Sequence, residues 1–391
     1  MELLTEKDKK KQLVITYIAF VMNGMLALSI GALLPFIREA RGLEYAFSGF
    51  LVSLHSVGNL LSSFLAGALA VRIGKKKSIL IFNSFYAISF LIILLSGNSV
   101  CLIIAFLMTG LARGASSNFC NAVVNNLAPG KAAIINGLHA MFSVGAFIFP
   151  IILMFITANG DANWVYACAV MVIAGIICWL LYFIIPIKEE KTQKQDKGSN
   201  YGFFKEPIFY LVIATMFFYL CAEQGVIGWL VTYFKDTGLM SASLAQLMAS
   251  VQWIMILLGR LVTAGLSSKV NKNKLLPIMG IGLVVFYFLL LKSTTPTWIV
   301  IGIVGFGFTM AGIYPTTVSY AGNLIQKYPL AWSFVLTIAG IGSIAMPSVI
   351  GAIADSAGIL AGMTSVAAVV LIDLGCIFAL TYYDKKNGQH V

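Results

Sequence analysis

Two stretches of this sequence, SVGAFIFP at 143–150 and GIGSIAMP at 340–347, decide its fold. The glycine and the proline of the first stretch, Gly145 and Pro150, recur as Gly342 and Pro347 after a shift of 197 residues. The same shift carries basic residues of one loop onto basic residues of another, namely Arg72, Lys75 and Lys77 onto Lys269, Lys272 and Lys274. Because these matches agree on one shift, the sequence predicts two repeated halves.

The composition predicts that both halves lie in a membrane. Residues of the set AVILMFWYC make up 59% of the 391 residues and charged residues only 10%, and the mean hydropathy is +0.92. A soluble domain carries about 45–50% apolar and about 25% charged residues. These values exclude a soluble enzyme, a nucleic-acid-binding domain and a single-span receptor.

Apolar runs separated by charged or turn-rich breaks predict an all-α polytopic membrane protein with twelve transmembrane helices. The runs lie at 12–37, 45–71, 77–96, 99–128, 131–157, 163–186, 205–234, 241–269, 274–292, 296–326, 328–355 and 359–384. Residues 1–187 and 205–391 then form two pseudo-symmetric six-helix bundles, joined by a polar linker at 188–204. Parallel repeats of this kind place a substrate site near the midplane between the halves.

The distribution of basic residues predicts the orientation, because Lys and Arg concentrate in cytoplasmic loops. Most of the 26 Lys and Arg residues fall on the side that holds both termini. The exceptions outside the spans are Arg38, Arg41, Lys235 and Lys292. We therefore expect a multi-pass protein of the cell membrane with both termini in the cytoplasm.

The sequence lacks the patterns of metal and cofactor sites. The six cysteines lie within or beside apolar runs and form no CxxC or His-containing cluster, so neither a disulfide framework nor a metal site is predicted. Walker, HExxH and GxSxG motifs are absent, which argues against an ATP-driven pump or an enzyme. We expect no cofactor and no nucleic-acid partner, and we expect a monomer in the lipid bilayer.

The loop GALAVRIGKKKSI at 67–79 resembles the pattern G-x-L-a-D-r-x-G-r-k of the major facilitator superfamily. Residues that match include Gly67, Arg72, Gly74 and Lys75, whereas Val71 stands where the family usually has Asp. The resemblance implies the major facilitator fold and transport by alternating access. It also implies that the matching residues form a gating loop.

Two further stretches resemble one branch of that superfamily, the fucose–galactose–glucose proton symporters. They are NGLHAMFSVGAFIFP at 136–150, similar to the fifth helix of the branch, and GFGFTMAGIYPT at 305–316, similar to the tenth. The resemblance implies uptake of a sugar with a proton. Known sugar symporters of the branch use acids in the first and fourth helices, whereas this chain has no acid inside its first span and carries Arg113 in its fourth.

Four charged residues lie inside the predicted spans, where each costs about 2.5–3.5 kcal/mol on insertion scales. They are Arg113, Glu223, Arg260 and Asp373. The resemblance places the fourth and seventh helices around the cavity, so Arg113 and Glu223 are expected to line it. Arg260, deeper toward the cytoplasm, is assigned to the inner gate, and Asp373 to helix packing.

Glu223 is the candidate for proton coupling, because burial favours the neutral form of a carboxyl and so suits it to carry a proton. The alternative is a static ion pair with Arg113 or Arg260. Arg113 itself can bind substrate through its fork of donors or serve in an internal pair. Its neighbours Gly110 and Gly114 form a small-residue pair for close helix packing.

Amide and aromatic side chains on the other cavity helices supply further candidate contacts for a polyhydroxylated or amphipathic solute. The predicted substrate-binding set, besides Arg113, is Asn23, Asn118, Asn121, Gln224, Trp229, Tyr314 and His139. The sequence thus predicts a secondary transporter that moves a small polar solute, with a sugar and proton coupling as the leading reading. The alternatives are an organic-anion transporter, which Arg113 favours, a drug–proton antiporter, and a sensor that transports nothing.

Overall fold

The structure is a computed structural model that describes residues 6–128, 132–187, 201–267, 269–328 and 330–387. This part of the chain consists of α-helices and two short 3-10 helices, with no β-strand. Twelve of the described helices are long and apolar enough to cross a membrane, which confirms the predicted all-α, twelve-span fold. Most of the predicted linker, 188–200, lies outside the described residues.

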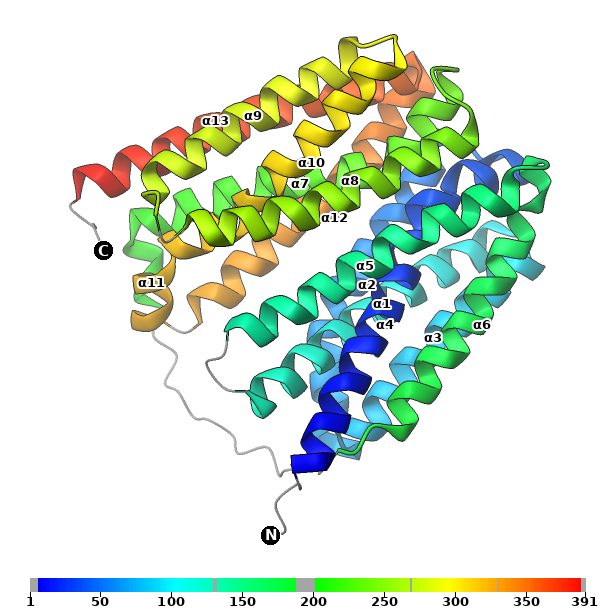
Figure 1. Ribbon diagram of the computed structural model, residues 1–391, viewed down its shortest axis with the longest axis horizontal. Helices are drawn as coiled ribbons and strands as arrows, with labels where there is room; N and C mark the ends of the chain where they lie inside the picture. Colours follow the sequence, from blue (N-terminus) through cyan, green and yellow to red (C-terminus); the bar gives the residue numbers. More distant parts are fainter. Residues whose placement is uncertain (1–5, 129–131, 188–200, 268, 329, 388–391) are drawn as a thin grey trace. The chain divides into compact units, whose positions relative to one another are not determined.

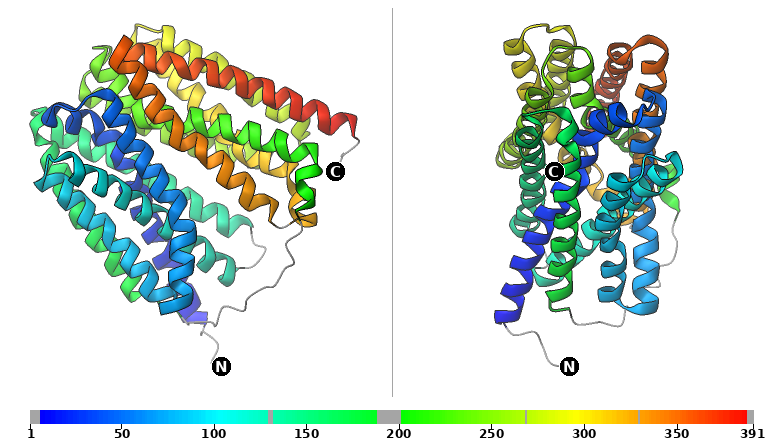
Figure 2. Two further views of the ribbon diagram at one scale, coloured as in Figure 1. Left: turned by 180° about the vertical axis from the view of Figure 1, so that it is seen from behind. Right: turned by 90° about the vertical axis from the view of Figure 1, so that its right-hand side faces the viewer.

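Unit 1 comprises Met1–Gly42 and Leu54–Lys194. Its helices are α1 (Glu6–Arg41), most of α2 (Tyr45–Ile73), α3 (Lys75–Leu95), α4 (Ser99–Leu127), α5 (Ala132–Thr157) and α6 (Trp164–Ile184), with the 3-10 helix η1 (Asp161–Asn163) before α6. In this unit α1 packs along α5, α4 and α6, and α3 packs against α4 and α6. Helices α3 and α6 lie side by side in every view (Figures 1 and 2).

Unit 2 comprises Leu43–Ser53, which holds the start of α2, and Gln195–Val391. Its helices are α7 (Pro207–Asp236), α8 (Ala242–Leu266), α9 (Lys272–Lys292), α10 (Pro296–Tyr320), α11 (Gly322–Lys327), α12 (Ala331–Ala357) and α13 (Ile359–Lys386), with the 3-10 helix η2 (Gly202–Lys205) before α7. Helix α7 packs along α12, and α9 packs against α10 and α13. These pairings repeat those of α1 with α5 and of α3 with α4 and α6, as the predicted pseudo-symmetry requires.

Some predicted helix ends were wrong. The span predicted at 296–326 is two helices, because α10 ends at Tyr320 and the six-residue α11 begins at Gly322, a residue that weakens a continuous helix. The seventh span begins at Pro207 rather than at 205, since proline is favoured in the first helical turn, where its missing N–H costs nothing. The first helix is longer than predicted and extends back to Glu6.

The repeated glycines Gly145 and Gly342 have the same structural role in their two units. A Cβ atom at Gly145 of α5 would collide with the backbone carbonyl of Val21 on α1, and one at Gly342 of α12 would collide with that of Phe217 on α7. Neither clash can be relieved by rotating a side chain, because the obstacle in each case is backbone. The glycines therefore let the first and fifth helices of each repeat approach closely.

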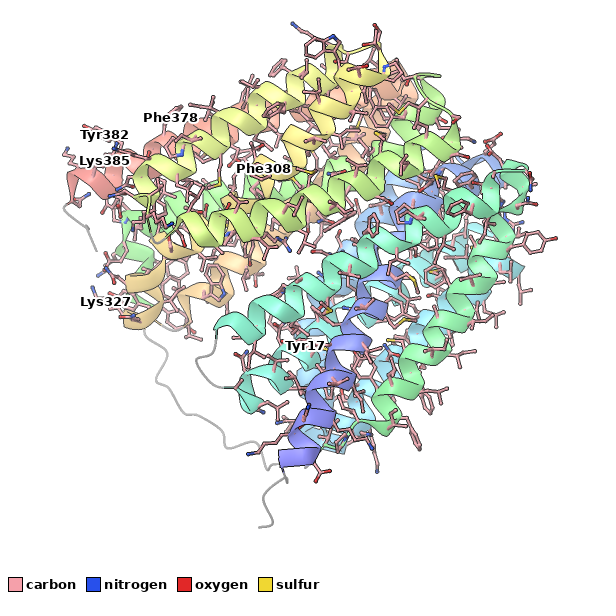
Figure 3. All side chains as sticks on the ribbon, viewed as in Figure 1. Tyr17, Phe308, Lys327, Phe378, Tyr382 and Lys385 are labelled. Atoms are coloured by element: carbon pink, nitrogen blue, oxygen red, sulfur yellow. The ribbon has the colours of Figure 1, made fainter. Side chains whose placement is uncertain are left out.

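Large apolar side chains cover the outer faces of the helices. On α13, for example, Phe378 and Tyr382 point outward with 46% and 68% of their surface exposed (Figure 3). Exposed apolar groups of this size on a long helix suit contact with lipid tails rather than with water. Some candidate polar groups, such as Glu223 and Asn23, are buried inside the bundles.

Candidate functional site

Glu223 of α7 lies in the interior of unit 2, with 9% of its surface exposed. Its Oε1 accepts a hydrogen bond from the Tyr219 hydroxyl at 2.9 Å, and its Oε2 accepts one from Nε2 of Gln224 at 3.3 Å. Tyr219 precedes Glu223 by four residues, so the helix places both side chains on one face. The predicted candidate for proton coupling is thus a buried carboxyl with two donors from its own helix.

Two other helices of unit 2 contribute to this site. The ring of Tyr314 on α10 lies 6.2 Å from that of Tyr219. The charges of Glu223 and of Arg260 on α8 both act on the two phenol groups. We call these residues, Tyr219, Glu223, Gln224, Arg260 and Tyr314, the carboxyl cluster.

The carboxyl cluster combines groups that suit two kinds of chemistry. A carboxyl with fixed donors nearby can hold a proton or release it, because the donors compensate the charge of the ionised form. Phenol, amide and guanidinium groups also provide the donors and acceptors that bind hydroxyl groups of a solute. Arg260 acts electrostatically on Tyr219 and Tyr314, the phenols beside Glu223, and its assignment to an inner gate stays a prediction.

Arg113 of α4 occupies a second polar site, in unit 1. Its Nη1 lies 3.3 Å from Nε2 of His55 on α2, and its guanidinium carbon lies 5.9 Å from the ring centre of Phe142 on α5. Nδ1 of His55 lies 2.8 Å from the hydroxyl of Thr109, one turn before Arg113 on α4. We call these four residues the guanidinium cluster.

Close packing of α2 on α4 makes the guanidinium cluster possible. A Cβ atom at Gly110 would collide with the carbonyl of His55, and one at Gly114 would collide with Asn59 and Ser62. This confirms that Gly110 and Gly114 form a small-residue pair that brings two helices together. The pair places the His55 ring beside the α4 side chains.

The predicted asparagines are scattered among different environments. Asn23 of α1 is fully buried, and it accepts a hydrogen bond from the Tyr86 hydroxyl at 2.6 Å and donates one to Ser117 at 3.1 Å. Its amide therefore links three helices of unit 1. Asn121 bonds a carbonyl of its own helix, and the exposed Asn118 donates to Ser63 of α2 at 3.2 Å. Their roles in substrate binding stay predictions.

Trp229 and His139 lie outside both clusters. Trp229 is fully buried and donates through Nε1 to the carbonyl of Pro347 on α12 at 3.0 Å, with its ring 6.0 Å from that of Tyr45. These contacts anchor α7 to α12 and to the start of α2. His139 of α5 is exposed, and its ring lies 6.0 Å from that of Phe20.

The predicted gating loop is a tight connection between α2 and α3. Gly74 alone separates the two helices and has a φ of 93°, which favours glycine. Lys76 at the start of α3 donates to the carbonyl of Ile185, at the end of α6, at 2.6 Å. Gly67 differs from Gly74, because a Cβ atom there would meet no atom within 4 Å. Arg72 and Lys75 lie on either side of the turn.

Asp373 of α13 is fully buried, and both of its carboxyl oxygens are without a hydrogen-bond donor in the described part of the chain. It lies close to Cys221 of α7 and to Cys376. It belongs to neither cluster, and its assignment to helix packing stays a prediction.

Sequence reasoning missed Tyr219 of the carboxyl cluster and His55, Thr109 and Phe142 of the guanidinium cluster. Of these, His55 contacts Arg113 through a ring nitrogen. Its position in the second span gave no signal, because a single histidine in an apolar helix is most often a packing residue. The pairing with Arg113 depends on which helices are neighbours, and residue spacing within one helix does not reveal that. The only sequence trace is the glycine pair beside Arg113, which predicted a close neighbour without identifying it.

Comparison with protein-family models gives the class of protein. The model of the Major Facilitator Superfamily matches residues 16–327, which is most of the chain. The chain therefore belongs to the major facilitator superfamily, and it is a multi-pass membrane transporter.

Known relatives cover nearly the whole chain. Proteins described as "Protein TsgA homolog" from Yersinia pseudotuberculosis and Yersinia pestis are each 22% identical over 380 residues, 96% of both chains. Among solved structures, the D-xylose-proton symporter has a TM-score of 0.78 at 14% identity and covers 95% of this chain and 96% of its own. The nucleoside transporter NupG has a TM-score of 0.74 at 14% identity, covering 98% of this chain and 100% of its own. At these identities the solved structures show the fold alone.

Proposed function

We propose that this transporter moves a small polar solute, a sugar or a similarly hydroxylated molecule, together with a proton. Glu223 binds the proton, and the surrounding phenol, amide and guanidinium groups bind the solute. The observation that carries the proposal is the buried Glu223 carboxyl with its two donors and the nearby Arg260. On this proposal the chain resembles the fucose–galactose–glucose proton symporters in substrate class, but with a different coupling residue.

The similar structures support a hydroxylated solute. One is titled a D-xylose-proton symporter and another a nucleoside transporter, and both of those solutes carry hydroxyl groups on a ring. The carboxyl cluster offers the donors and acceptors that such groups require. The proposal also places the protein in the cell membrane as a monomer with both termini in the cytoplasm.

An organic anion is the second candidate substrate, and the guanidinium groups favour it. Arg113 and Arg260 place a permanent positive charge in the interior of each unit. A guanidinium group binds a carboxylate through two parallel hydrogen bonds. A drug–proton antiporter has no comparable observation in its favour.

The test separates coupling from binding. A thermal-shift screen of monosaccharides, nucleosides, carboxylates and lipophilic cations first identifies a solute. Glu223→Gln, in proteoliposomes, keeps the shape of the side chain but cannot ionise. We expect this variant to exchange labelled solute for unlabelled solute across the membrane, yet to lose accumulation driven by a pH gradient or a potential.

The expected loss is large, because one positive charge moving down 100 mV supplies about 2.3 kcal/mol, or roughly a 50-fold concentration gradient at 1.4 kcal/mol per decade. Glu206→Gln, at a partly exposed acid just before α7, is the matched control and should accumulate solute as the wild type does. Accumulation by Glu223→Gln at the wild-type level would show that Glu223 is not the coupling site. Loss of exchange as well would assign Glu223 to solute binding or to a structural pair.

A further inference from the structure

The imidazole of His55 is enclosed between two side chains of α4. Only 4% of its surface is exposed. Nδ1 lies 2.8 Å from the Thr109 hydroxyl oxygen, and Nε2 lies 3.3 Å from Nη1 of Arg113. Both ring nitrogens are thus engaged by α4.

The hydrogen-bond directions around His55 fit one proton arrangement. The Thr109 hydroxyl donates to the carbonyl of Phe106 at 2.6 Å, so its oxygen is an acceptor toward Nδ1. Nδ1 therefore carries the hydrogen, and in a neutral ring Nε2 is then the acceptor. A guanidinium group has only donors, so Arg113 donates to Nε2. His55 is neutral in this arrangement.

We propose that His55 is a second proton-binding site, and that its protonation state decides whether Arg113 is held or released. A proton added to the lone pair of Nε2 turns the imidazole into an imidazolium. The ring then presents an N–H group to the guanidinium, so the hydrogen bond from Arg113 is lost and two positive charges face each other at the same distance. The bond from Nδ1 to Thr109 is unaffected, so the ring stays in place while Arg113 moves.

The surroundings of His55 couple its protonation to the release of Arg113, because burial and the adjacent guanidinium both oppose a positive charge on the ring and the second of these is relieved when Arg113 moves away. The charged group that acts on His55 is Arg113, and Arg113 also acts on Tyr86 of α3, whose hydroxyl donates to Asn23 of α1. From α5, Phe142 offers Arg113 the face of an aromatic ring. The acidic residues in the sequence of unit 1 lie near the ends of its spans rather than at their centres. In the described part of unit 1, the charge that acts on His55 is therefore that of a guanidinium rather than that of a carboxylate.

The use of this site in transport rests on the proposed function, but the site itself does not. Arg113 is a predicted substrate contact, so a proton on His55 would free its donors for a solute. That arrangement would link protonation in unit 1 to substrate binding, independently of Glu223 in unit 2. It also makes His55 a positioning residue that acts through Arg113.

The first experiment reads the protonation of His55 directly. Long-range nitrogen–proton NMR spectra of histidine-labelled protein in nanodiscs distinguish the two neutral tautomers from the imidazolium, and His55→Gln assigns the signal. We expect the Nδ1–H tautomer at neutral pH and conversion to imidazolium on acidification. The Nε2–H tautomer, or an imidazolium at neutral pH, would overturn the proposal.

The second experiment reads the release of Arg113. Hydrogen exchange of its guanidinium is followed in arginine-labelled protein, with Arg113→Lys assigning the signal. In the wild type, the protection of Arg113 should fall at least tenfold on acidification, about 1.4 kcal/mol. His55→Gln keeps an acceptor for Arg113 but binds no proton, so its protection should be independent of pH.

The outcomes separate this proposal from the function of Glu223. A Glu223→Gln protein should still show both pH responses of the guanidinium cluster, even if it no longer accumulates solute. Protection of Arg113 that does not change with pH in the wild type would refute the switch. Protection that changes equally in His55→Gln would assign the response to another group and would refute the role of His55.

Discussion

A partly buried ion pair joins the end of α13 to the start of α9, and removing its acid should weaken unit 2. Asp384 is fully buried, and its two oxygens accept hydrogen bonds from Nζ of Lys272 at 3.2 Å and from Nδ2 of Asn273 at 2.8 Å. The amide oxygen of Asn273 accepts in turn from the Tyr320 hydroxyl at 2.7 Å. Asp384→Ala removes the acceptor of both donors.

The magnitude follows from the exposure of the two donors. Asn273 is only 4% exposed, and a buried donor left without a partner costs about 1–3 kcal/mol. Lys272 has 25% of its side chain exposed, and its Nζ lies 4.3 Å from the centre of the Tyr320 ring. Water and this ring therefore compensate part of the interaction that Lys272 loses with Asp384. Breaking a fully buried pair costs about 3–5 kcal/mol, and with this partial compensation we expect a loss of about 2–4 kcal/mol.

The measurement is the free energy of unfolding of the purified protein in detergent micelles, obtained from denaturant titrations. The matched control is Glu206→Ala, which breaks the exposed ion pair between Glu206 and Lys327, at 2.8 Å, in the same unit. Exposed pairs contribute little, so this control should unfold close to the wild type. If Asp384→Ala also unfolded within about 0.5 kcal/mol of the wild type, the argument from burial would be refuted.

Three other predictions follow from the two repeats and from one exposed ion pair. Gly145→Val should destabilise unit 1 by about 1–3 kcal/mol through overpacking, whereas Gly67→Ala, where a Cβ meets open space, should not, as thermal unfolding of the two variants will show. Pro347 lies inside α12, and Pro347→Ala should slow solute turnover more than it weakens solute binding, because a continuous helix ladder resists bending; an unchanged turnover number would refute a role of Pro347 in helix bending. The hydrogen bond from Lys327 lowers the pKa of Glu206, so the pair stabilises the fold above the ordinary pKa of a glutamate and loses this effect as pH falls through the lowered value. Wild type and Glu206→Gln should therefore differ slightly at neutral pH and converge in acid, and equal stability curves in both ranges would contradict this.

The spans and the repeat were predictable because the bilayer imposes their sequence pattern. A helix that crosses a hydrocarbon core must be apolar over about 20 residues, so composition alone located the twelve spans. Gly145 and Gly342 were visible as a repeat, because contacts between helix backbones require small residues. The break between α10 and α11 was missed, because the residues at the break, Ala321 and Gly322, include no charged residue or proline to mark it.

The candidate sites were predictable only as far as their interactions are local in sequence. Tyr219 and Glu223 are one helical turn apart, so their contact follows from helix geometry. The partner of Arg113 lies on another helix, and spacing along α4 contains no information about it. Asn23 illustrates a second limit, because a buried amide that joins helices and one that binds a solute have the same sequence signal.

The contact at the start of the third helix of each unit has a consequence for how this chain evolved. The repeat shift carries Lys76 onto Asn273, and each of them fastens the third helix to the end of the sixth helix of its unit. Lys76 donates a hydrogen bond to the backbone carbonyl of Ile185, whereas Asn273 donates one to the carboxylate of Asp384. If an ancestral gene encoding six helices was duplicated, the two copies kept the same fastening point while its chemistry diverged. The two units thus keep the joint between the third and sixth helices while different residues form it.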